Sequence, residues 1–317
     1  MVELGYALSS EECSPQDLVR YAQRAEEVGF TFAMISDHYH PWIDRQGQSA
    51  FVWSVIGAIA CTTKRLQLGT GVTCPIRRIH PAIIAQAAAT AAVMMPGRFT
   101  LGVGTGENLN EHILGERWPP HDIRLAMLEE AMQVIRLLWQ GGNQTHRGQF
   151  YTVENARLYT LPDSLPPILV AASGAHAAAA AGRVGDGLVT TREETEILEH
   201  FVQAGGASKP RYIQFTACWA QDEASALRTA CEYWPNAGIK GELSQELPTP
   251  AYFEQASKLV RPEDIAQAVI CGPDPARHVQ KIQELTDAGY DHIYVHQIGP
   301  DQEGFLRFYE REVLPKV

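Results

Sequence analysis

The sequence has no cysteine pair spaced as Cys-x-x-Cys, and no apolar run in it approaches the ~20 residues that span a membrane. Its 6 cysteines are scattered, which is typical of reduced thiols rather than of a disulfide framework or a zinc motif. The segment that begins at Met1 lacks the basic leader and the apolar stretch of a secretory signal. We therefore expect a cytoplasmic protein without a membrane partner.

Positive charge is also scarce. The 317 residues include 26 Lys and Arg against 37 Asp and Glu, which gives a formal net charge of -11. Such a surface repels nucleic-acid phosphates and anionic lipids unless basic residues gather on one face, and the sequence shows no basic cluster. We expect a small-molecule partner and no nucleic acid.

Short β-type runs alternate with helical patterns along the whole chain, which predicts a parallel sheet covered by helices. The chain is 45% hydrophobic and 20% charged, as globular proteins are, and α/β barrels reach this length as one domain. The predicted strands are Leu4–Leu8, Phe32–Ser36, Leu66–Val72, Phe99–Val103, Ile168–Ala172, Gly187–Thr190, Arg211–Ala217 and His292–His296. These eight strands predict the α/β class, as a single (β/α)8 TIM barrel domain over residues 1–317.

Local signals mark several of the intervening helices. Ser14 before Pro15 predicts an N-cap followed by proline at the first helical position. Glycines that lie between a helix and the next strand are expected to end the helix in the left-handed conformation. These glycines are Gly29, Gly97, Gly182 and Gly289.

Two segments interrupt the alternation. Residues 141–167 contain β-rich runs that indicate an inserted hairpin, and residues 235–262 form a polar stretch bounded by prolines. Insertions in a barrel usually follow strands, so we expect them at the C-terminal mouth. The second is a candidate substrate lid, although a plain surface loop would have the same composition.

In a (β/α)8 barrel, catalytic residues gather where the strands end. The second predicted strand leads into Asp37, His38, His40 and Trp42. Two histidines at positions i and i+2 without a third nearby are a poor zinc site, so no metal is expected. A lone histidine often has only a structural hydrogen bond, but here a carboxylate, an indole and Glu107 on a nearby strand end favour a site for proton transfer.

Glycines follow the fourth strand, in the segment Gly102–Glu107. They read Gly-x-Gly-x-Gly rather than the dinucleotide pattern Gly-x-Gly-x-x-Gly, and Pro119-Pro120 interrupt the expected helix, so a Rossmann site is not expected. The glycines indicate a tight turn, a backbone that a flat ring can approach closely, or both.

Small polar residues follow the fifth and sixth strands. Ser173-Gly174 opens one helix, and Thr190 and Thr191 precede the next. Backbone N–H groups and hydroxyls at these helix starts could bind a phosphate, and the same side chains could equally cap the helices.

These segments resemble the luciferase-like superfamily, specifically its deazaflavin (coenzyme F420) branch of sugar-phosphate and secondary-alcohol dehydrogenases. The resemblance covers nearly the whole chain. The segments that carry it are Ser36–Trp42, Thr73–Gln86, Gly102–Glu111 and Gly182–Gly187.

The resemblance implies an F420-dependent oxidoreductase that transfers a hydride between a substrate C–OH carbon and C5 of the deazaflavin. It implies His38 as the base, Glu107 as its acid partner and Trp42 as a wall of the pocket, and the roles of His38 and Glu107 could be exchanged. The implied cofactor-binding residues are Asp37, Gly71, Val72, Thr105, Gly106, Asn110, Ser173, Gly174, Thr190 and Thr191. Family members also have a non-proline cis peptide that corresponds to Gly71–Val72, and they suggest a homodimer.

The substrate is less closely defined. Sugar-phosphate members bind the phosphate with two lysines and one arginine, and the corresponding residues here are Glu194, Ser244 and Ala268. Each lost charge-assisted bond would cost about 1.5–3 kcal/mol, so we expect a neutral alcohol, hemiacetal or sugar. The alternatives are a sugar-phosphate dehydrogenase with an altered phosphate site, an FMN-dependent monooxygenase and a non-catalytic cofactor carrier.

Overall fold

A computed structural model describes residues 2–239 and 241–317. Its eight parallel barrel strands follow the order β9-β11-β1-β2-β3-β4-β7-β8, and β8 pairs with β9 to close the ring. The strands are β1 (Glu3–Leu8), β2 (Phe32–Ile35), β3 (Gln67–Thr70), β4 (Phe99–Val103), β7 (Ile168–Ala171), β8 (Gly187–Thr190), β9 (Arg211–Cys218) and β11 (His292–Gln297). Each predicted strand is present, so the predicted (β/α)8 barrel is confirmed.

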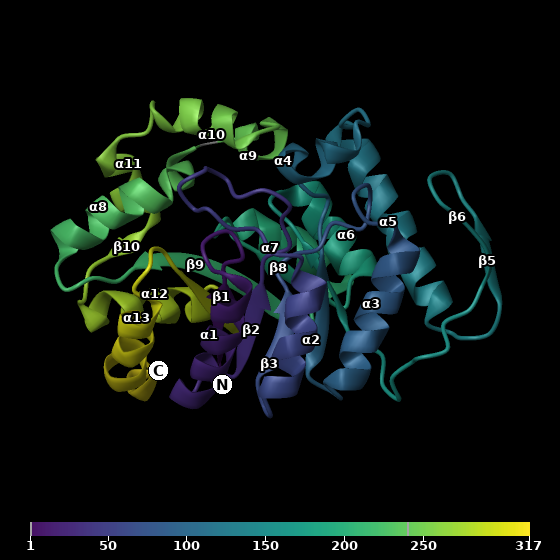
Figure 1. Ribbon diagram of the computed structural model, residues 1–317, viewed down its shortest axis with the longest axis horizontal. Coiled ribbons are helices and arrows are strands. Elements are labelled where there is room, and N and C mark those ends of the chain that lie inside the picture. The colour runs from purple at the N-terminus through teal and green to yellow at the C-terminus, as the bar shows by residue number, and fades with distance from the viewer. Residues whose placement is uncertain (1, 240) are drawn as a thin grey trace.

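Helices surround the barrel (Figure 1). The helices that follow the barrel strands are α1 (Pro15–Val28), α2 (Val52–Thr62), α3 (Pro81–Met94), α5 (His121–Leu138), α6 (Ala175–Val184), α7 (Thr195–Phe201), α12 (Pro275–Asp287) and α13 (Gln302–Phe308). They cover the outer face of the sheet, and this explains why strands such as β2 and β4 are buried at every position and mostly apolar.

Helix α1 begins and ends where the sequence predicts. The Ser14 side chain accepts a hydrogen bond from the backbone N–H of Asp17, and Gly29 ends the helix at φ 110°. Gly97 and Gly289 also have positive φ, as predicted. The prediction for Gly182 is wrong, because this residue lies inside α6. A Cβ there would come within 2.4 Å of the carbonyl oxygen of Phe201, so the glycine serves close packing against α7.

Side chains alternate between the barrel interior and the helix layer. Leu8 and Ile35 face the helices, whereas their neighbours Ala7 and Met34 belong to an apolar cluster inside the barrel. That cluster consists of Ala7, Phe32, Met34, Leu169, Val189, Tyr212 and Tyr294. Several of its members also line the cavity at the mouth of the barrel.

The first insertion differs from our expectation. Residues 141–167 form the predicted hairpin, β5 (Gln144–Arg147) and β6 (Thr152–Ala156), but the hairpin lies along the outside of α5 rather than at the mouth (Figure 1). Its turn is held by Glu130 of α5, whose carboxylate accepts hydrogen bonds from the backbone N–H groups of Gln149, Phe150 and Tyr151. The reason is topological: this insertion follows a helix, not a strand.

The second insertion lies at the mouth. After α8 (Glu223–Tyr233), a helical turn at Pro235–Gly238 and the helices α9 (Leu243–Glu246) and α10 (Pro250–Ser257) run along the top of Figure 1. The chain then returns to the barrel through α11 (Pro262–Ala268) and the short strand β10 (Ile270–Cys271), which pairs with β9. We call residues 235–262 the mouth segment.

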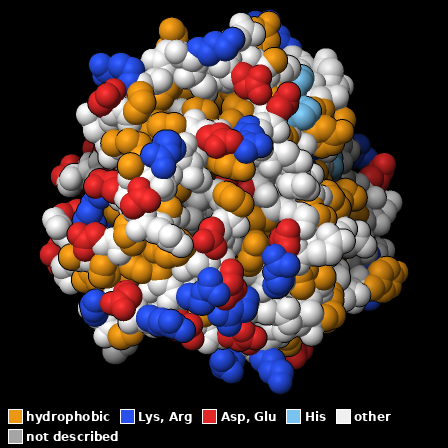
Figure 2. Space-filling view, turned by 60° about the vertical axis from the view of Figure 1, so that its left-hand side comes forward, with side chains coloured by type: hydrophobic (Ala, Val, Ile, Leu, Met, Phe, Trp, Pro, Cys, Tyr) orange, Lys and Arg blue, Asp and Glu red, His pale blue; other side chains and the backbone are white. Residues whose placement is uncertain are grey.

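The surface carries charges of both signs. On the face shown in Figure 2, Lys and Arg side chains lie beside Asp and Glu side chains rather than in a separate basic block. Across residues 2–239 and 241–317, no helix combines the length and apolar character needed to cross a membrane.

Candidate active site

A cavity of about 310 Å³ opens at the C-terminal ends of the barrel strands. Its size lies at the lower end of the range of about 300–1,000 Å³ that small-molecule sites occupy. Most of the residues expected at the site line it, because parallel strands bring their carboxyl ends to one rim. These residues are His38, Trp42, Gly71, Val72, Thr105, Gly106, Glu107, Ser173, Thr190 and Thr191.

One wall of the cavity is formed largely by backbone. The Gly71–Val72 peptide is cis, as the resemblance implies. A Cβ at Gly104 would lie 2.8 Å from the side chain of Val72, and one at Gly106 would lie 2.5 Å from the Cys74 sulfur. Gly106 also has φ 73°, which favours glycine. The wall therefore requires glycine at these two positions for its own packing.

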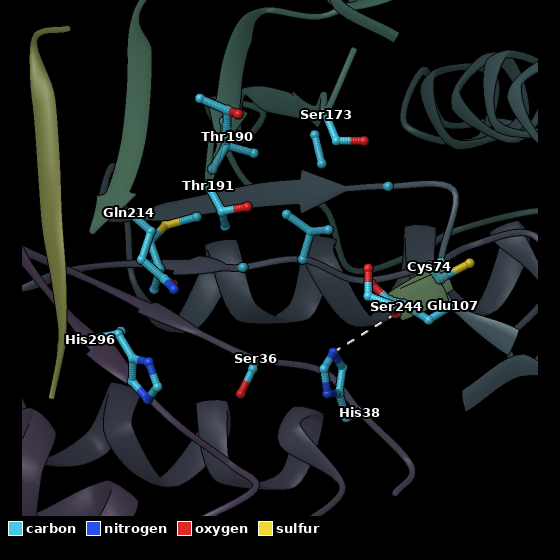
Figure 3. A pocket seen from close by; sticks show the side chains of 18 of the residues that line it. Ser36, His38, Cys74, Glu107, Ser173, Thr190, Thr191, Gln214, Ser244 and His296 are labelled. Carbon is cyan, nitrogen blue, oxygen red and sulfur yellow. Dashed lines mark ion pairs between the residues drawn. The ribbon is translucent and has the colours of Figure 1, made fainter. Parts of the chain in front are cut away.

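His38 lies opposite this wall and contacts two carboxylates. Its Nδ1 lies 2.6 Å from Glu11 Oε1, and its Nε2 lies 3.9 Å from Glu107 Oε2 (Figure 3). The ring of Trp42 meets the imidazole edge-on, with 5.1 Å between centroids. An imidazole, a carboxylate and an indole are thus gathered at one point of the cavity, as the sequence predicts.

The Glu11–His38 pair sets the charge of the site. Burial by itself lowers the pKa of His38, but the Glu11 carboxylate outweighs this effect and raises that pKa to about 9. Burial would likewise raise the pKa of Glu11, yet the imidazolium and the Ser36 hydroxyl lower it to about 2. At neutral pH the pair is therefore an imidazolium beside a carboxylate.

Sequence reasoning missed Glu11. Its second oxygen, Oε2, accepts hydrogen bonds from the hydroxyls of Ser9, at 2.9 Å, and Ser36, at 2.8 Å. The segment Ser9-Ser10-Glu11-Glu12 follows β1 directly, so the strand-end criterion that identified His38 would also have identified Glu11 if it had been applied to the first strand.

Three residues that we expected to bind the cofactor are not among the described residues that line the cavity. Asp37 is buried behind the wall, where Thr73 Oγ1 donates to it at 2.7 Å and Arg78 Nη2 at 2.8 Å. Asn110 is also buried, and its Oδ1 accepts from the backbone N–H groups of Tyr39 and His40 while its Nδ2 donates to Glu107 Oε2 at 3.3 Å. Asp37 and Asn110 therefore support the loop that carries His38.

Gly174, the third of these residues, is the N-cap of α6, and no side chain caps that helix. The neighbouring Ser173 hydroxyl instead accepts a hydrogen bond from Gln245 of the mouth segment at 3.3 Å. Thr190 Oγ1 accepts from the backbone N–H of Arg192 at 3.0 Å. At the start of α6, the capping alternative for Ser173 is therefore wrong, and the N–H groups there remain available to an anion.

The mouth segment contributes directly to the cavity. Ser244 and Gln245 line it, and Phe253 packs against Trp42 with 5.1 Å between ring centroids. Arg124 of α5, which is 1% exposed, holds the segment from below through Glu246 Oε1 and Gln245 Oε1, both at 3.2 Å. The predicted second insertion thus covers part of the mouth.

Metal chemistry has no evident donor set here. Within the described residues, no group of three or more His, Cys, Asp or Glu side chains is arranged to hold a metal ion. The titratable group that the site offers is the imidazole of His38, which lines the cavity and is paired with Glu11.

Comparison with known proteins identifies similar molecules over the full length. The family model described as luciferase-like monooxygenase matches residues 2–292. The F420-dependent glucose-6-phosphate dehydrogenase of Beutenbergia cavernae is 36% identical, with 100% of this chain and 98% of that protein covered.

Two solved structures are also similar. An F420-dependent secondary alcohol dehydrogenase in complex with an F420-acetone adduct has a TM-score of 0.92 and 30% identity, and the match covers 100% of this chain and 99% of that one. The coenzyme F420 dependent tetrahydromethanopterin reductase from Methanopyrus kandleri has a TM-score of 0.78 and 22% identity, with 99% of each chain covered, and supports the fold alone.

Proposed function

The chain belongs to the luciferase-like family, and on that premise we propose that it is an F420-dependent oxidoreductase that transfers a hydride between an alcohol carbon and C5 of the deazaflavin. The observation that carries the proposal is the imidazole of His38, which Glu11 holds in the cavity opposite a wall formed largely by backbone. The names of the Beutenbergia cavernae relative and of the secondary alcohol dehydrogenase, which are 36% and 30% identical to this chain, include F420 dependence.

The proposed cofactor site follows the wall of the cavity. Gly71, Val72, Thr105 and Gly106 would contact the ring, and Ser173, Gly174, Thr190 and Thr191 would bind its phosphate-bearing tail near the start of α6. Asp37 and Asn110 would act from behind the wall, through the loop they support. When bound, F420 supplies the hydride acceptor or donor at C5.

We assign the proton transfer of the reaction to the Nε2 atom of His38. Glu11 occupies the other ring nitrogen, so Nε2 is the atom that faces Glu107 and can exchange a proton with a substrate oxygen. Trp42 restricts the imidazole from one side, and Glu107 is positioned by Asn110. With a His38 pKa of about 9, the protonated form that donates to a carbonyl oxygen prevails at neutral pH, and the base needed for alcohol oxidation forms as the pH rises.

A neutral substrate is favoured over a sugar phosphate. Arg192 is the one Lys or Arg side chain among the described residues that line the cavity, and Glu194 pairs with it at 3.3 Å. Ser244, which replaces a cation of the sugar-phosphate enzymes, also lines the cavity. A phosphate dianion would therefore lack the charge-assisted partners that make it bind.

A spectroscopic screen tests the proposal. Loss of deazaflavin absorbance is followed with neutral alcohols, free sugars and sugar phosphates, and turnover with neutral alcohols or sugars is expected. A preference for glucose 6-phosphate would contradict the substrate class. Quenching of Trp42 and Trp234 fluorescence by F420 and by FMN separates the cofactors, and micromolar FMN binding without F420 binding would contradict the choice of cofactor.

We further propose a homodimer in the cytoplasm. All 6 cysteines are free, which suits a reducing compartment. Ile83, Val93 and Met94 are exposed apolar side chains of α3 that a second copy could cover. Sedimentation analysis would give the mass of a dimer, and a monomer at micromolar concentration would contradict the proposal.

A further inference from the structure

The cavity has a second polar end, away from Glu107. Gln214 of β9 and His296 of β11 both line it, and they lie on paired neighbouring strands. Figure 3 shows both side chains pointing into the cavity, with Ser36 between His296 and His38. The His38 site described above uses neither residue.

His296 is held as firmly as His38. Its Nε2 lies 3.1 Å from Glu12 Oε2, and both side chains are 4% exposed. The other oxygen of Glu12 accepts a hydrogen bond from the backbone N–H of Gly299 at 2.9 Å. The Trp234 ring packs against the imidazole at 4.4 Å between centroids. Consecutive glutamates, Glu11 and Glu12, thus each fix one imidazole at the cavity.

Two polar groups at this end of the cavity make no hydrogen bond within the described protein. Within residues 2–239 and 241–317, neither Nδ1 of His296 nor the side-chain amide of Gln214 has a hydrogen-bond partner. The nearby hydroxyls of Ser9 and Ser36 differ, because both donate to Glu11. Neither residue is among the described residues that have a fully buried, unpartnered polar atom, so both groups are open to the cavity and can bind a molecule that enters it.

We infer that His296 and Gln214 bind a second oxygen function of the substrate, a hydroxyl or a carbonyl, while the reacting carbinol lies at His38. The inference rests on the proposed function and narrows its substrate class to uncharged polyols and hydroxy-carbonyl compounds. An amide and a ring nitrogen can both donate to and accept from such a group. The Glu12 carboxylate behind His296 disfavours an anion at this end.

The test compares alcohols that share a carbon skeleton: 2-butanol with 2,3-butanediol, and 2-hexanol with 2,5-hexanediol. Binding is measured by Trp fluorescence, and kcat/KM is measured with F420. We expect at least one diol to exceed its mono-alcohol about tenfold in both measurements. Equal binding within both pairs would overturn the inference.

Gln214→Leu should remove the diol preference by weakening diol binding more than mono-alcohol binding, because the mono-alcohol has no second oxygen for Gln214 to bind. His296→Gln, which can still donate to Glu12, should weaken the preference as well. Gln149→Leu is the matched control on the outer hairpin. Equal losses of diol and mono-alcohol binding in Gln214→Leu would contradict a specificity role.

The two proposals fail differently. A diol preference in binding without any F420 turnover would support the second polar end and contradict the proposed function. F420 turnover without a diol preference would support the proposed function and overturn the inference that His296 and Gln214 bind a second oxygen of the substrate.

Discussion

The imidazole of His38 has a different use in each of its protonation states. As a cation it can donate a proton to a carbonyl oxygen, and as a neutral ring it can accept one from an alcohol. Glu11 determines which state prevails, because its carboxylate raises the pKa of His38 to about 9 against the effect of burial. The direction of the reaction is therefore linked to pH through one ion pair.

Replacing His38 tests its catalytic role. We expect His38→Ala to lower turnover by about 100-fold or more, as loss of a general acid or base does, and to leave F420 affinity nearly unchanged. Turnover is measured from deazaflavin absorbance and affinity from Trp quenching, with His200→Ala as the control, because the His200 side chain on α7 is 40% exposed. Unchanged turnover would favour a cofactor carrier, and equal losses of turnover and affinity would indicate a binding role.

Replacing Glu11 tests the ion pair. In the wild type, alcohol oxidation should rise with pH through about 9, and carbonyl reduction should fall over the same range. Glu11→Gln removes the carboxylate, so the midpoint of both pH dependences should move down to about pH 6.5 or lower. The pH profile of kcat/KM measures this shift, and Glu154→Gln on the outer hairpin is the control. A profile that keeps its midpoint near pH 9 would refute the role of Glu11.

A buried arginine of another element contributes to the position of the mouth segment. Arg124 lies in the first turns of α5, is almost fully buried, and stacks over the Trp118 ring at 4.4 Å while it binds Glu246 and Gln245. The mouth segment itself consists mainly of short helices and turns. Arg124 therefore helps to hold the segment over the cavity, together with Asn108, whose Nδ2 donates to the Glu246 carbonyl at 2.9 Å.

We expect Arg124→Met to loosen the mouth segment. Loss of charge-assisted bonds of about 1.5–3 kcal/mol should speed proteolytic cleavage within residues 241–262 about tenfold or more and raise KM more than it lowers kcat. Limited proteolysis and steady-state kinetics measure these effects. Arg183→Met, which removes a surface pair with Glu129, should change neither quantity. Unchanged cleavage would show that other contacts hold the segment.

At the scale of the molecule, the cavity depends on the closed barrel. Its lining residues come from β1, β2, β7, β8, β9 and β11 and from the loops after β3 and β4. A ligand that binds here contacts strands from the whole chain, so its binding free energy should stabilise the barrel as a unit.

Thermal unfolding tests this view. We propose that residues 1–317 unfold in one transition, and we expect F420 at 100 times its Kd to add about 2.7 kcal/mol to the free energy of unfolding. For a chain of this size that raises Tm by roughly 5 °C, whereas FMN should leave Tm unchanged. Differential scanning calorimetry measures both. Two separate transitions, or stabilisation by FMN alone, would contradict the expectation.

The sequence by itself determined the strands and much of the candidate site. All eight strands were predictable because apolar runs, helical spacing and glycine positions are local signals. His38, Trp42 and Glu107 could be grouped before any coordinates, because parallel strands bring their carboxyl ends to one rim. The outer hairpin was recognisable as well, although its position against α5 was not.

Only the tertiary structure decided how these residues are charged and paired. Glu11, after β1, meets His38, after the next strand β2, and Glu12 meets His296 of β11 from the other end of the chain. The pKa of His38 depends on burial and on the distance to a carboxylate, and neither is encoded in local spacing. Local pattern therefore fixed which elements form, and packing between distant elements fixed the chemistry available at their ends.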